Sequence, residues 1–584
     1  MRESLLHHFD DVWVDNLNGD KFRTGKRIPD WAPSGAGGAD ESIFTTARDP
    51  RGIQPGTTIT TWLKRGDDNA DQPARVHYRD FWGRAGDKRR ALLRSLDPLD
   101  AAEADEVATR PEGPRPYEAL PSPSRERTWK LLPYETTGGF DDWYGLDELF
   151  PAREQGVNPN RGLQGKSIVE VDSDALAARM QDYFSDLSFE EIGERHPELV
   201  HEWARYDPKT VRETLQAKSA FDADAIEDYV LFPLDARHIY YERSYYADHP
   251  DDNTKVNLLN ERRPELGDNL DGNEFLISVP EARQTSEGLP LLATSLFDLH
   301  LHDRGAVGFP AEVPYVVPAR EGDMFTEATP ETVTRVANLD PAFWEDVRDE
   351  WSLGGGLDSE AGKAFVRRLF RVVLALLHAP AYQDDHRDAL SQDWARVPVP
   401  RDRGVFDRTA ALGDQIATLL DPLVSADAIV RSILGGDAFA SLAKLRRVGG
   451  GPVREADLVV EILHFGGANG GWRPVADQVS EPSGTRDGVL HISDEVYFEN
   501  VPEAVWLFEI GGYPVVKKWL GYRDRKRRDG RPLTLREKDH LRSIVRRIAA
   551  LLALHDDLDA VYSDAIEDPW TPPEVVLPDS GSSE

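Results

Sequence analysis

One stretch of the sequence has residues of the types and spacing that could bind a metal ion: Asp298, His300 and His302. On a β-strand these three side chains would share one face, because side chains alternate along a strand. Imidazole nitrogens and a carboxylate oxygen on one face can bind a metal ion. Strand histidines also bind neighbouring backbone or carboxylate groups, and no second cluster of ligands is evident. We therefore expect no metal site in this chain.

A glycine-rich stretch at 354–364 superficially resembles a phosphate-binding loop. Its spacing does not fit that motif, and Ala364 has no hydroxyl group to bind the magnesium ion of a bound nucleotide. We interpret the stretch as a turn that starts a helix.

The motifs of self-sufficient enzymes are absent from the sequence. It contains neither Gly-x-Ser-x-Gly nor His-Glu-x-x-His. Adenine methyltransferases hold the target base with Asn/Asp-Pro-Pro-Tyr/Phe, and the nearest fragments here are Asn158-Pro159-Asn160 and Asp568-Pro569-Trp570. No glycine-rich loop follows a strand as an S-adenosylmethionine site requires. We predict that this chain has no catalytic residue and no cofactor site of its own.

Basic and aromatic residues gather between 517 and 531, which we call the basic segment. The residues concerned are Lys517, Lys518, Tyr522, Arg523, Arg525, Lys526, Arg527, Arg528 and Arg531. Arginine can bind guanine or phosphate through two parallel hydrogen bonds, and aromatic rings can stack on bases. The segment therefore predicts a DNA contact. The alternative is a solvated loop between helices, balanced by nearby carboxylates.

A second candidate DNA contact lies on a tyrosine-rich strand and comprises Arg237, Tyr240 and Arg243. The alternative for this strand is a place in the hydrophobic core.

The composition limits where the protein works and what it contains. The net charge is −35, with 54 Arg and only 15 Lys against 104 Asp and Glu, and there is no Cys. Disulfides, thiolate nucleophiles and sulfur metal sites are excluded. Excess acid and scarce lysine are typical of a protein from a high-salt cytoplasm. The longest apolar stretches, 372–377 and 548–554, are shorter than the ~20 residues of a membrane span.

The hydrophobic periodicity predicts a mixed α+β, multidomain chain. Strands are expected at 12–17, 53–63, 75–78, 238–241, 274–279, 458–465 and 488–492. Helices are expected at 88–96, 174–183, 208–217, 364–378, 406–420 and 535–554, the last with Thr534 as N-cap and Glu537 three residues on. Residues 97–128 are typical of a linker and 567–584 of a disordered acidic tail.

Three blocks resemble the C-terminal specificity region of type ISP restriction–modification enzymes. They are residues 229–241, residues 374–382 with 396–400, and residues 497–502 with 505–506, 511–515, 518–520 and 523. The resemblance spans about 129–562. The beginning, through 1–10, 16–19, 42–44, 52–56, 76–78 and 81–83, resembles the tail of the adenine-N6 methyltransferase domain of the same enzymes.

The resemblance implies an organisation and a role. The domains would be 1–96, part of a methyltransferase α/β lobe; 97–128, a linker; 129–328 and 448–566, two halves of a target-recognition domain; and 329–447, a helical spacer. The chain would recognise double-stranded DNA, and the target adenine would be flipped into a pocket built mainly elsewhere. S-adenosylmethionine, and ATP for a helicase, would be bound by a separately encoded methyltransferase or helicase–nuclease half, since this chain starts part-way through the methyltransferase domain.

Two other functions stay open. One is a complete adenine methyltransferase with diverged motifs. The other is a scaffold of a phage-defence complex that does not contact DNA.

Overall fold

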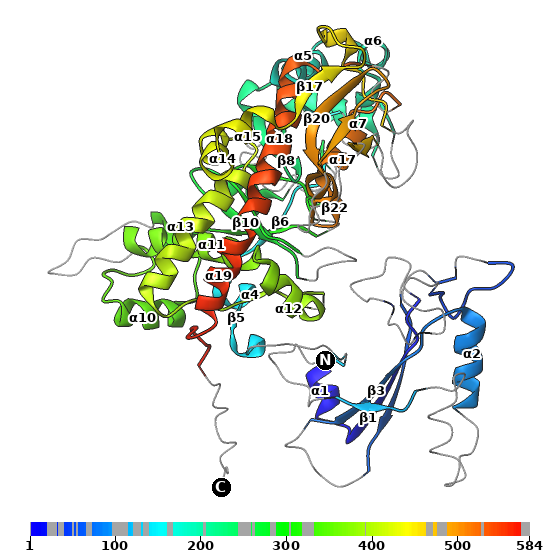
Figure 1. Ribbon diagram of the computed structural model, residues 1–584, viewed down its shortest axis with the longest axis vertical. Helices are drawn as coiled ribbons and strands as arrows, with labels where there is room; N and C mark the ends of the chain where they lie inside the picture. The colour runs from blue at the N-terminus through cyan, green and yellow to red at the C-terminus, as the bar shows by residue number, and fades with distance from the viewer. Residues whose placement is uncertain are drawn as a thin grey trace. The chain divides into compact units, whose positions relative to one another are not determined.

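The computed structural model describes two compact units of the chain (Figure 1). Unit 1 comprises residues 1–142, 280–287 and 385–395, and unit 2 comprises 143–279, 288–384 and 396–584. The described residues are 2–19, 28, 32, 40–49, 52–53, 56–65, 73–95, 115–120, 130–131, 133, 139–159, 167–202, 206–242, 258–259, 263–280, 288–302, 305–317, 332–391, 393–462, 471–475, 487–526 and 531–573.

Unit 1 holds a small mixed sheet with the strand order β2-β1-β3-β4. Strand β1 runs parallel to β3 and antiparallel to β2. The bounds are α1 (Arg2–Leu6), β1 (Asp11–Asn16), β2 (Thr58–Leu63), β3 (Arg75–Asp80), α2 (Ala85–Arg94) and β4 (Glu118–Ala119). Leu6, Val12, Val14, Val76 and Tyr78 form its core. The strands predicted at 12–17 and 75–78 and the helix predicted at 88–96 are confirmed by β1, β3 and α2. Strand β2 covers only the second half of the strand predicted at 53–63, and β4 pairs with β3 from within the stretch predicted as a linker.

The first part of unit 2 contains two small sheets, ordered β12-β8-β9-β7 and β11-β10-β13-β6, and the hairpin β14–β15. Helix α5 packs against β7, β8 and β9. The bounds are β6 (Glu154–Gln155), β7 (Val169–Glu170), α5 (Ser173–Phe184), α6 (Phe189–Arg195), α7 (Pro208–Lys218), β8 (Ile226–Phe232), β9 (Asp235–Tyr240), β10 (Phe275–Ser278), β11 (Leu291–Ala293), β12 (Leu296–Phe297), β13 (Val307–Pro310), β14 (Glu312–Val317) and β15 (Thr332–Ala337).

Helices dominate the middle of unit 2, as the periodicity predicts. They are α10 (Pro341–Glu350), α11 (Glu360–Leu377), α13 (Arg403–Leu420), α14 (Asp427–Leu434) and α15 (Gly436–Ser441). The stretch at 354–364 leads into α11 as expected, and Ser359 caps that helix by accepting a hydrogen bond from the Gly362 N–H at 3.2 Å. Helices α11 and α13 lie side by side (Figure 1). The rings of Phe365 and Phe406 stack between them.

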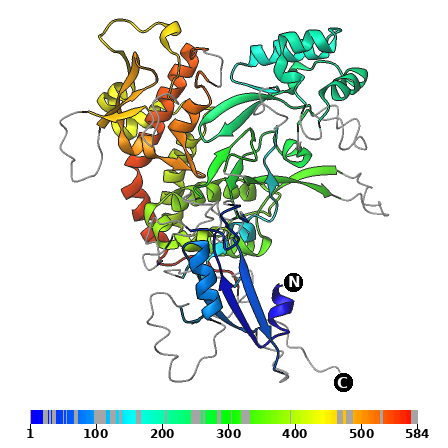
Figure 2. The same ribbon diagram turned by 90° about the vertical axis from the view of Figure 1, so that its right-hand side faces the viewer.

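The last part of unit 2 combines an antiparallel sheet, β17-β20-β19-β18, with α16 to α19. The bounds are β17 (Lys444–Arg447), β18 (Trp472–Pro474), β19 (Asp487–His491), β20 (Val496–Pro502), α16 (Glu503–Leu507), α17 (Val515–Gly521), α18 (Leu535–Ala553) and α19 (His555–Ala565). Helix α18 packs against α13, α14, α16 and α17, so it joins the helical middle to this last sheet (Figure 2).

The strand predicted at 458–465 is wrong for its described residues. Val460 makes one isolated bridge, to Asp524, and residues 463–465 lie outside the described residues. Leu458 and Val460 accept hydrogen bonds from the N–H groups of Leu533 and Arg525. Leu458, Val460 and Ile462 are buried, so the alternating pattern reflects burial of an extended segment that forms no regular ladder.

The contact between α11 and α13 gives a testable prediction at Gly413. A Cβ atom there would lie 1.9 Å from the carbonyl oxygen of Arg371, which belongs to helix backbone and cannot easily move. We expect Gly413→Ala to lower the free energy of unfolding by about 1–3 kcal/mol, the usual effect of overpacking. Urea denaturation followed by circular dichroism measures it.

Gly404→Ala on the same helix is the matched control. A Cβ atom there would meet only side-chain atoms, of Asp402 at 3.0 Å and Arg408 at 3.7 Å. We expect its stability to stay within about 1 kcal/mol of the wild type. Equal stability of both variants would contradict the close approach of Gly413 to the backbone of Arg371.

Candidate nucleic-acid interface

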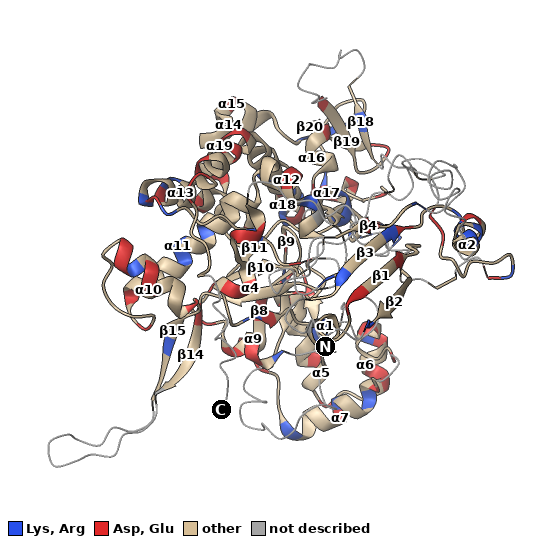
Figure 3. Cartoon of the chain, turned by 90° about the horizontal axis from the view of Figure 1, so that it is seen from below, with Lys and Arg blue, Asp and Glu red and all other residues tan. Residues whose placement is uncertain are grey.

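The basic segment runs from α17 to the start of α18. Lys517 and Lys518 lie on α17, Tyr522 to Lys526 follow it, Arg527 and Arg528 lie outside the described residues, and Arg531 precedes α18. The predicted start of α18 is confirmed. The Thr534 hydroxyl accepts a hydrogen bond from the Glu537 N–H at 3.1 Å, and the Glu537 carboxylate accepts one from the Thr534 N–H at 3.0 Å. Figure 3 shows basic residues on both α17 and α18.

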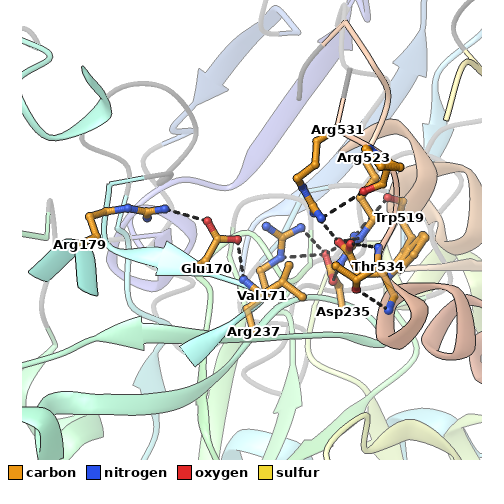
Figure 4. Close-up of polar contacts among 11 residues, drawn as sticks. Glu170, Val171, Arg179, Asp235, Arg237, Trp519, Arg523, Arg531 and Thr534 are labelled. Atoms are coloured by element: carbon orange, nitrogen blue, oxygen red, sulfur yellow. Dashed lines mark hydrogen bonds and ion pairs between the residues drawn. The ribbon is translucent and has the colours of Figure 1, made fainter. Parts of the chain in front are cut away.

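Arg523 is at the centre of a buried ion network, formed with Asp235, Arg237 and Glu537 (Figure 4). Its guanidinium donates to Asp235 Oδ1 at 2.9 Å and to Glu537 Oε1 at 3.1 Å. Arg523, Asp235 and Glu537 side chains are each 1% exposed. The Arg523 Cζ lies 3.7 Å from the centre of the Trp519 ring. The network therefore joins β9 to the two ends of the basic segment.

The charges of the network keep both carboxyl groups ionised. Burial raises the pKa of Asp235, but the neighbouring charges of Arg237 and Arg523 outweigh burial, and the pKa is lowered. Burial likewise opposes ionisation of Glu537, and the hydrogen bond from Arg531 with the charge of Arg523 lowers its pKa. The carboxylates stabilise the buried guanidinium groups in return.

Arg237 and Tyr240 also lie inside the protein. The Arg237 guanidinium donates to Asp235 Oδ2 at 2.9 Å and is 6% exposed. The Tyr240 hydroxyl accepts a hydrogen bond from the Asp222 N–H at 3.1 Å, and burial raises its pKa. The alternative of a strand packed in the core therefore describes these two residues, and Arg243 lies outside the described residues.

Three of the residues predicted to contact DNA are buried in the structure. Arg237, Tyr240 and Arg523 have no surface to offer a groove in this conformation, because their polar groups are bound within the chain. Sequence density alone could not reveal this, since Asp235 lies 288 residues before Arg523 in the sequence. Through Asp235 and Glu537, Arg523 positions the segment that carries the remaining residues.

Lys518 and Tyr522 belong to an aromatic cluster. The Lys518 Nζ lies 4.1 Å from the centre of the Tyr513 ring, 4.9 Å from that of Phe232 and 5.5 Å from that of Tyr522. The rings of Phe232 and Tyr522 are 4.6 Å apart. These cation–π contacts hold both side chains half-buried beside the network.

Arg525, Lys526 and Arg531 carry the exposed charge of the described basic segment. Arg525 is 63% exposed and forms an ion pair with Glu461 at 2.6 Å. Arg531 is 40% exposed and binds Glu537 at 2.9 Å. Lys517 is half-buried on α17. The pair of Arg525 with Glu461 lies at the surface and contributes little energy, so an incoming phosphate can compete for Arg525. Arg531 differs, because its partner Glu537 is buried in the network.

A cavity of about 480 Å³ adjoins the network. It lies between strand β9, helix α18 and the residues that follow α13. Its polar lining includes Asp228, Arg237, His238, Arg536, Glu537, Asp539, His540 and Arg547. Burial lowers the pKa of His540 to about 4, so its imidazole is neutral near pH 7. The sequence does not point to Arg536, His540, Ser543 and Arg547 as site residues, although their spacing on one face of α18 is a signal that could have found them.

Asp298, His300 and His302 do not share one face of a strand, because β12 ends at Phe297. The Asp298 carboxylate turns the chain by accepting the His300 N–H at 2.6 Å. His302 is fully buried against Gly511, and burial lowers its pKa to about 4. Among the described residues, no group of three or more His, Asp or Glu side chains is arranged to hold a metal ion.

No helix among the described residues is both long and apolar enough to cross a membrane.

Comparisons with known proteins agree with the sequence resemblance. The family model of the Type ISP C-terminal specificity domain matches residues 148–549. No curated protein matches the chain.

Three solved structures are similar to the chain. They are the ATP-dependent Type ISP restriction-modification enzyme LlaBIII bound to DNA (14% identity, TM-score 0.52, 98% of this chain and 32% of that one), the DrdV–DNA complex (13%, 0.51, 96% and 48%) and a nuclease-deletion mutant of the Type ISP restriction-modification enzyme LlaGI with a DNA substrate mimic (14%, 0.50, 96% and 37%). At these identities the likeness shows a shared fold. The chain spans between a third and a half of the length of these proteins.

Removing Arg523 tests the buried ion network. Arg523→Ala leaves Asp235 and Glu537 buried without this partner, so we expect the free energy of unfolding to fall by about 3–5 kcal/mol. Arg408→Ala is the control: it breaks an exposed pair with Asp564 at 2.9 Å and should cost at most about 1 kcal/mol. Denaturant unfolding measures both.

The stability that Arg523 contributes should depend on pH. The folded pKa values of Asp235 and Glu537 are lowered, so their ion pairs stabilise the fold above the ordinary carboxyl pKa of about 4, and this stabilisation is lost as pH falls below it. The difference in the free energy of unfolding between the wild type and Arg523→Ala should become smaller as the pH is lowered from about 5. A difference independent of pH would mean that Arg523 acts through packing alone.

Proposed function

The chain belongs to the family of the Type ISP C-terminal specificity domain, and on that premise we propose that it is the DNA sequence-recognition part of a restriction–modification system. The observation that carries this proposal is the family match over residues 148–549, which includes β9, α17 and most of α18. These elements contribute the buried ion network and the ordered ends of the basic segment.

The basic segment supports recognition of double-stranded DNA. Arg525 and Lys526 are exposed on a chain of net charge −35, and the network fixes the backbone on both sides of them. Arginines whose neighbouring backbone is held in place can reach a groove with little further loss of conformational entropy, which applies here to Arg525. Each bidentate contact to a base would contribute about 1–3 kcal/mol of discrimination. Arg527 and Arg528 join these residues in the proposal.

Unit 1 is proposed to be the end of an adenine-N6 methyltransferase domain that a separately encoded catalytic half completes. Strand β2 lies at one edge of its sheet, with Ile59 and Leu63 exposed. Such an edge can be covered by pairing with another chain. S-adenosylmethionine and ATP would be bound by that half, since this sequence has neither the Asn-Pro-Pro-Tyr motif nor the glycine-rich loop.

A high-salt cytoplasm is the proposed setting. The excess of Asp and Glu and the ratio of Arg to Lys support it. In such salt the electrostatic attraction to phosphates weakens, so direct contacts with bases would contribute a larger share of the affinity.

The absence of methyl transfer by the chain alone is one test. Purified chain incubated with duplex DNA and radiolabelled S-adenosylmethionine should incorporate no label, because the motifs that hold cofactor and base are missing. Incorporation would favour a complete methyltransferase with diverged motifs.

Replacing Arg525, Arg527 and Arg528 with Ala tests DNA recognition by the basic segment. We expect weaker binding at moderate salt and a smaller salt dependence, by about 0.9 in the log–log slope for each phosphate that the variant no longer binds. A residue that reads guanine should also relax sequence preference by about 1–3 kcal/mol at one position. Mobility-shift titrations at several salt concentrations measure both effects.

The matched control replaces Arg348, Arg403 and Arg408, which lie on or beside α10 and α13, and removes the same charge. Equal slopes for the two triple variants would move the DNA contact away from the basic segment. No binding by the wild-type chain would favour the scaffold function.

A further inference from the structure

An arginine cluster lies on the face of α18 that packs against α14 and α15. Its members are Arg431 of α14, Arg542 and Arg546 of α18, and Phe439 of α15. The 542 and 546 side chains are four residues apart and share one face of the helix. Gly435, with φ of +84°, makes the turn between α14 and α15 that brings Phe439 back toward Arg431. Figure 1 shows α14 and α15 beside α18.

Phe439 holds two of the guanidinium groups. The Cζ atoms of Arg431 and Arg546 each lie 3.8 Å from the centre of its ring. Both distances are those of a cation–π contact, so the one ring holds both groups. The ring is 4% exposed and Arg546 is 9% exposed, whereas Arg431 is exposed. The stacking fixes the orientation of both groups before any ligand binds.

The cluster lacks the carboxylate partners that are common elsewhere in this chain. Within the part of the chain that the structure describes, the guanidinium groups of Arg431, Arg542 and Arg546 make no ion pair and no hydrogen bond. The Nε atoms of Arg542 and Arg546 are buried and without a hydrogen-bond partner among the described residues. By contrast, Arg367 and Arg371 bind carboxylates of Glu312, Glu274 and Asp414.

The charges around the cluster favour an anion. Burial lowers the pKa of Arg546, and the positive charges of Arg542 and Arg431 lower it further, against the opposing effect of Asp427 and Asp539. Three like charges with two carboxylates at longer range leave an excess positive charge on a chain whose net charge is −35. Guanidinium groups that make no ion pair among the described residues favour an oxyanion, and the exposed Arg431 and partly exposed Arg542 are the members that one can reach.

We propose that Arg431, Arg542 and Arg546 form a binding site for phosphate groups of the DNA backbone. This inference rests on the proposed function and adds to it a contact that lies outside the basic segment. A guanidinium group presents paired N–H donors that match two oxygens of a phosphate. Because phosphate groups carry no sequence information, the site would add affinity without sequence preference. The contacts with Phe439 hold Arg431 and Arg546 in place for it.

The double variant Arg431→Gln with Arg542→Gln tests the site in the full-length chain. Both side chains are at least partly exposed, so the fold should persist, and an unchanged melting temperature checks it. Binding of a fluorescent duplex is measured by anisotropy over a series of salt concentrations. We expect the log–log slope to fall by about 1.8 if each arginine contacts one phosphate. The preference between a cognate and a scrambled duplex should stay the same.

Arg403→Gln with Arg408→Gln is the matched control, since both are exposed arginines of α13 that face Asp407 and Asp564. Its slope should equal that of the wild type. Arg546→Lys keeps the charge but loses the planar, two-donor group. We expect it to weaken binding and to leave the slope nearly unchanged.

The outcomes separate this site from the proposed function. If the wild type binds no duplex, the proposed function fails. If the wild type binds duplex and the double variant has the same affinity and slope, the phosphate site is overturned and the proposed function stands. Inorganic phosphate gives a further arm: if it raises the melting temperature of the wild type but not of the double variant, while the DNA slopes agree, the site takes a free anion and the DNA assignment is overturned.

Discussion

The buried salt bridges of Arg523 with Asp235 and Glu537 are the interaction on which unit 2 depends. They connect β9 with the end of α17 and the start of α18, across 288 residues of sequence. Glu537 has three roles at once, because it caps α18 and binds both Arg523 and Arg531. Burying such charges costs desolvation energy, so the network contributes less to net stability than to a unique arrangement of these elements.

This network explains how an acidic chain holds the described parts of its basic segment in place. Arg523 ties down the residues after α17, and Arg531 ties down those before α18. Between them the segment exposes Arg525 and Lys526. The arginines that lie close together in the sequence therefore have different roles. Arg523 and Arg531 position the segment, and Arg525 is free of the network and can reach a partner.

The sequence predicts regular elements well where one periodicity persists for several turns. Helices α11, α13 and α18 follow the pattern of buried residues along one face, and the N-cap at Thr534 follows from its spacing to Glu537. The prediction at 458–465 is wrong because burial alternates along an irregular segment held by residues 525 and 533. The burial of Arg523 depends on Asp235, a carboxylate 288 residues away that only the tertiary fold brings beside it, and no local pattern encodes this contact. Arg237 binds the same carboxylate from two residues further along β9.

Helix α18 shows that the environment of an arginine, more than its position on a basic helix, decides what it can bind. Arg547 is buried like Arg546, yet it donates to the carbonyl oxygens of residues 418, 419, 421 and 424, which include the unpaired carbonyls at the end of α13. Its role is thus complete within the chain. Arg546, one position earlier, faces α14 and α15 and finds an aromatic ring and other arginines there. Arg547 shows that the protein can supply hydrogen-bond acceptors to a buried arginine of this helix. The unpaired Nε donor of Arg546 therefore reflects the face of α18 on which it lies, where α14 and α15 offer no acceptor among the described residues.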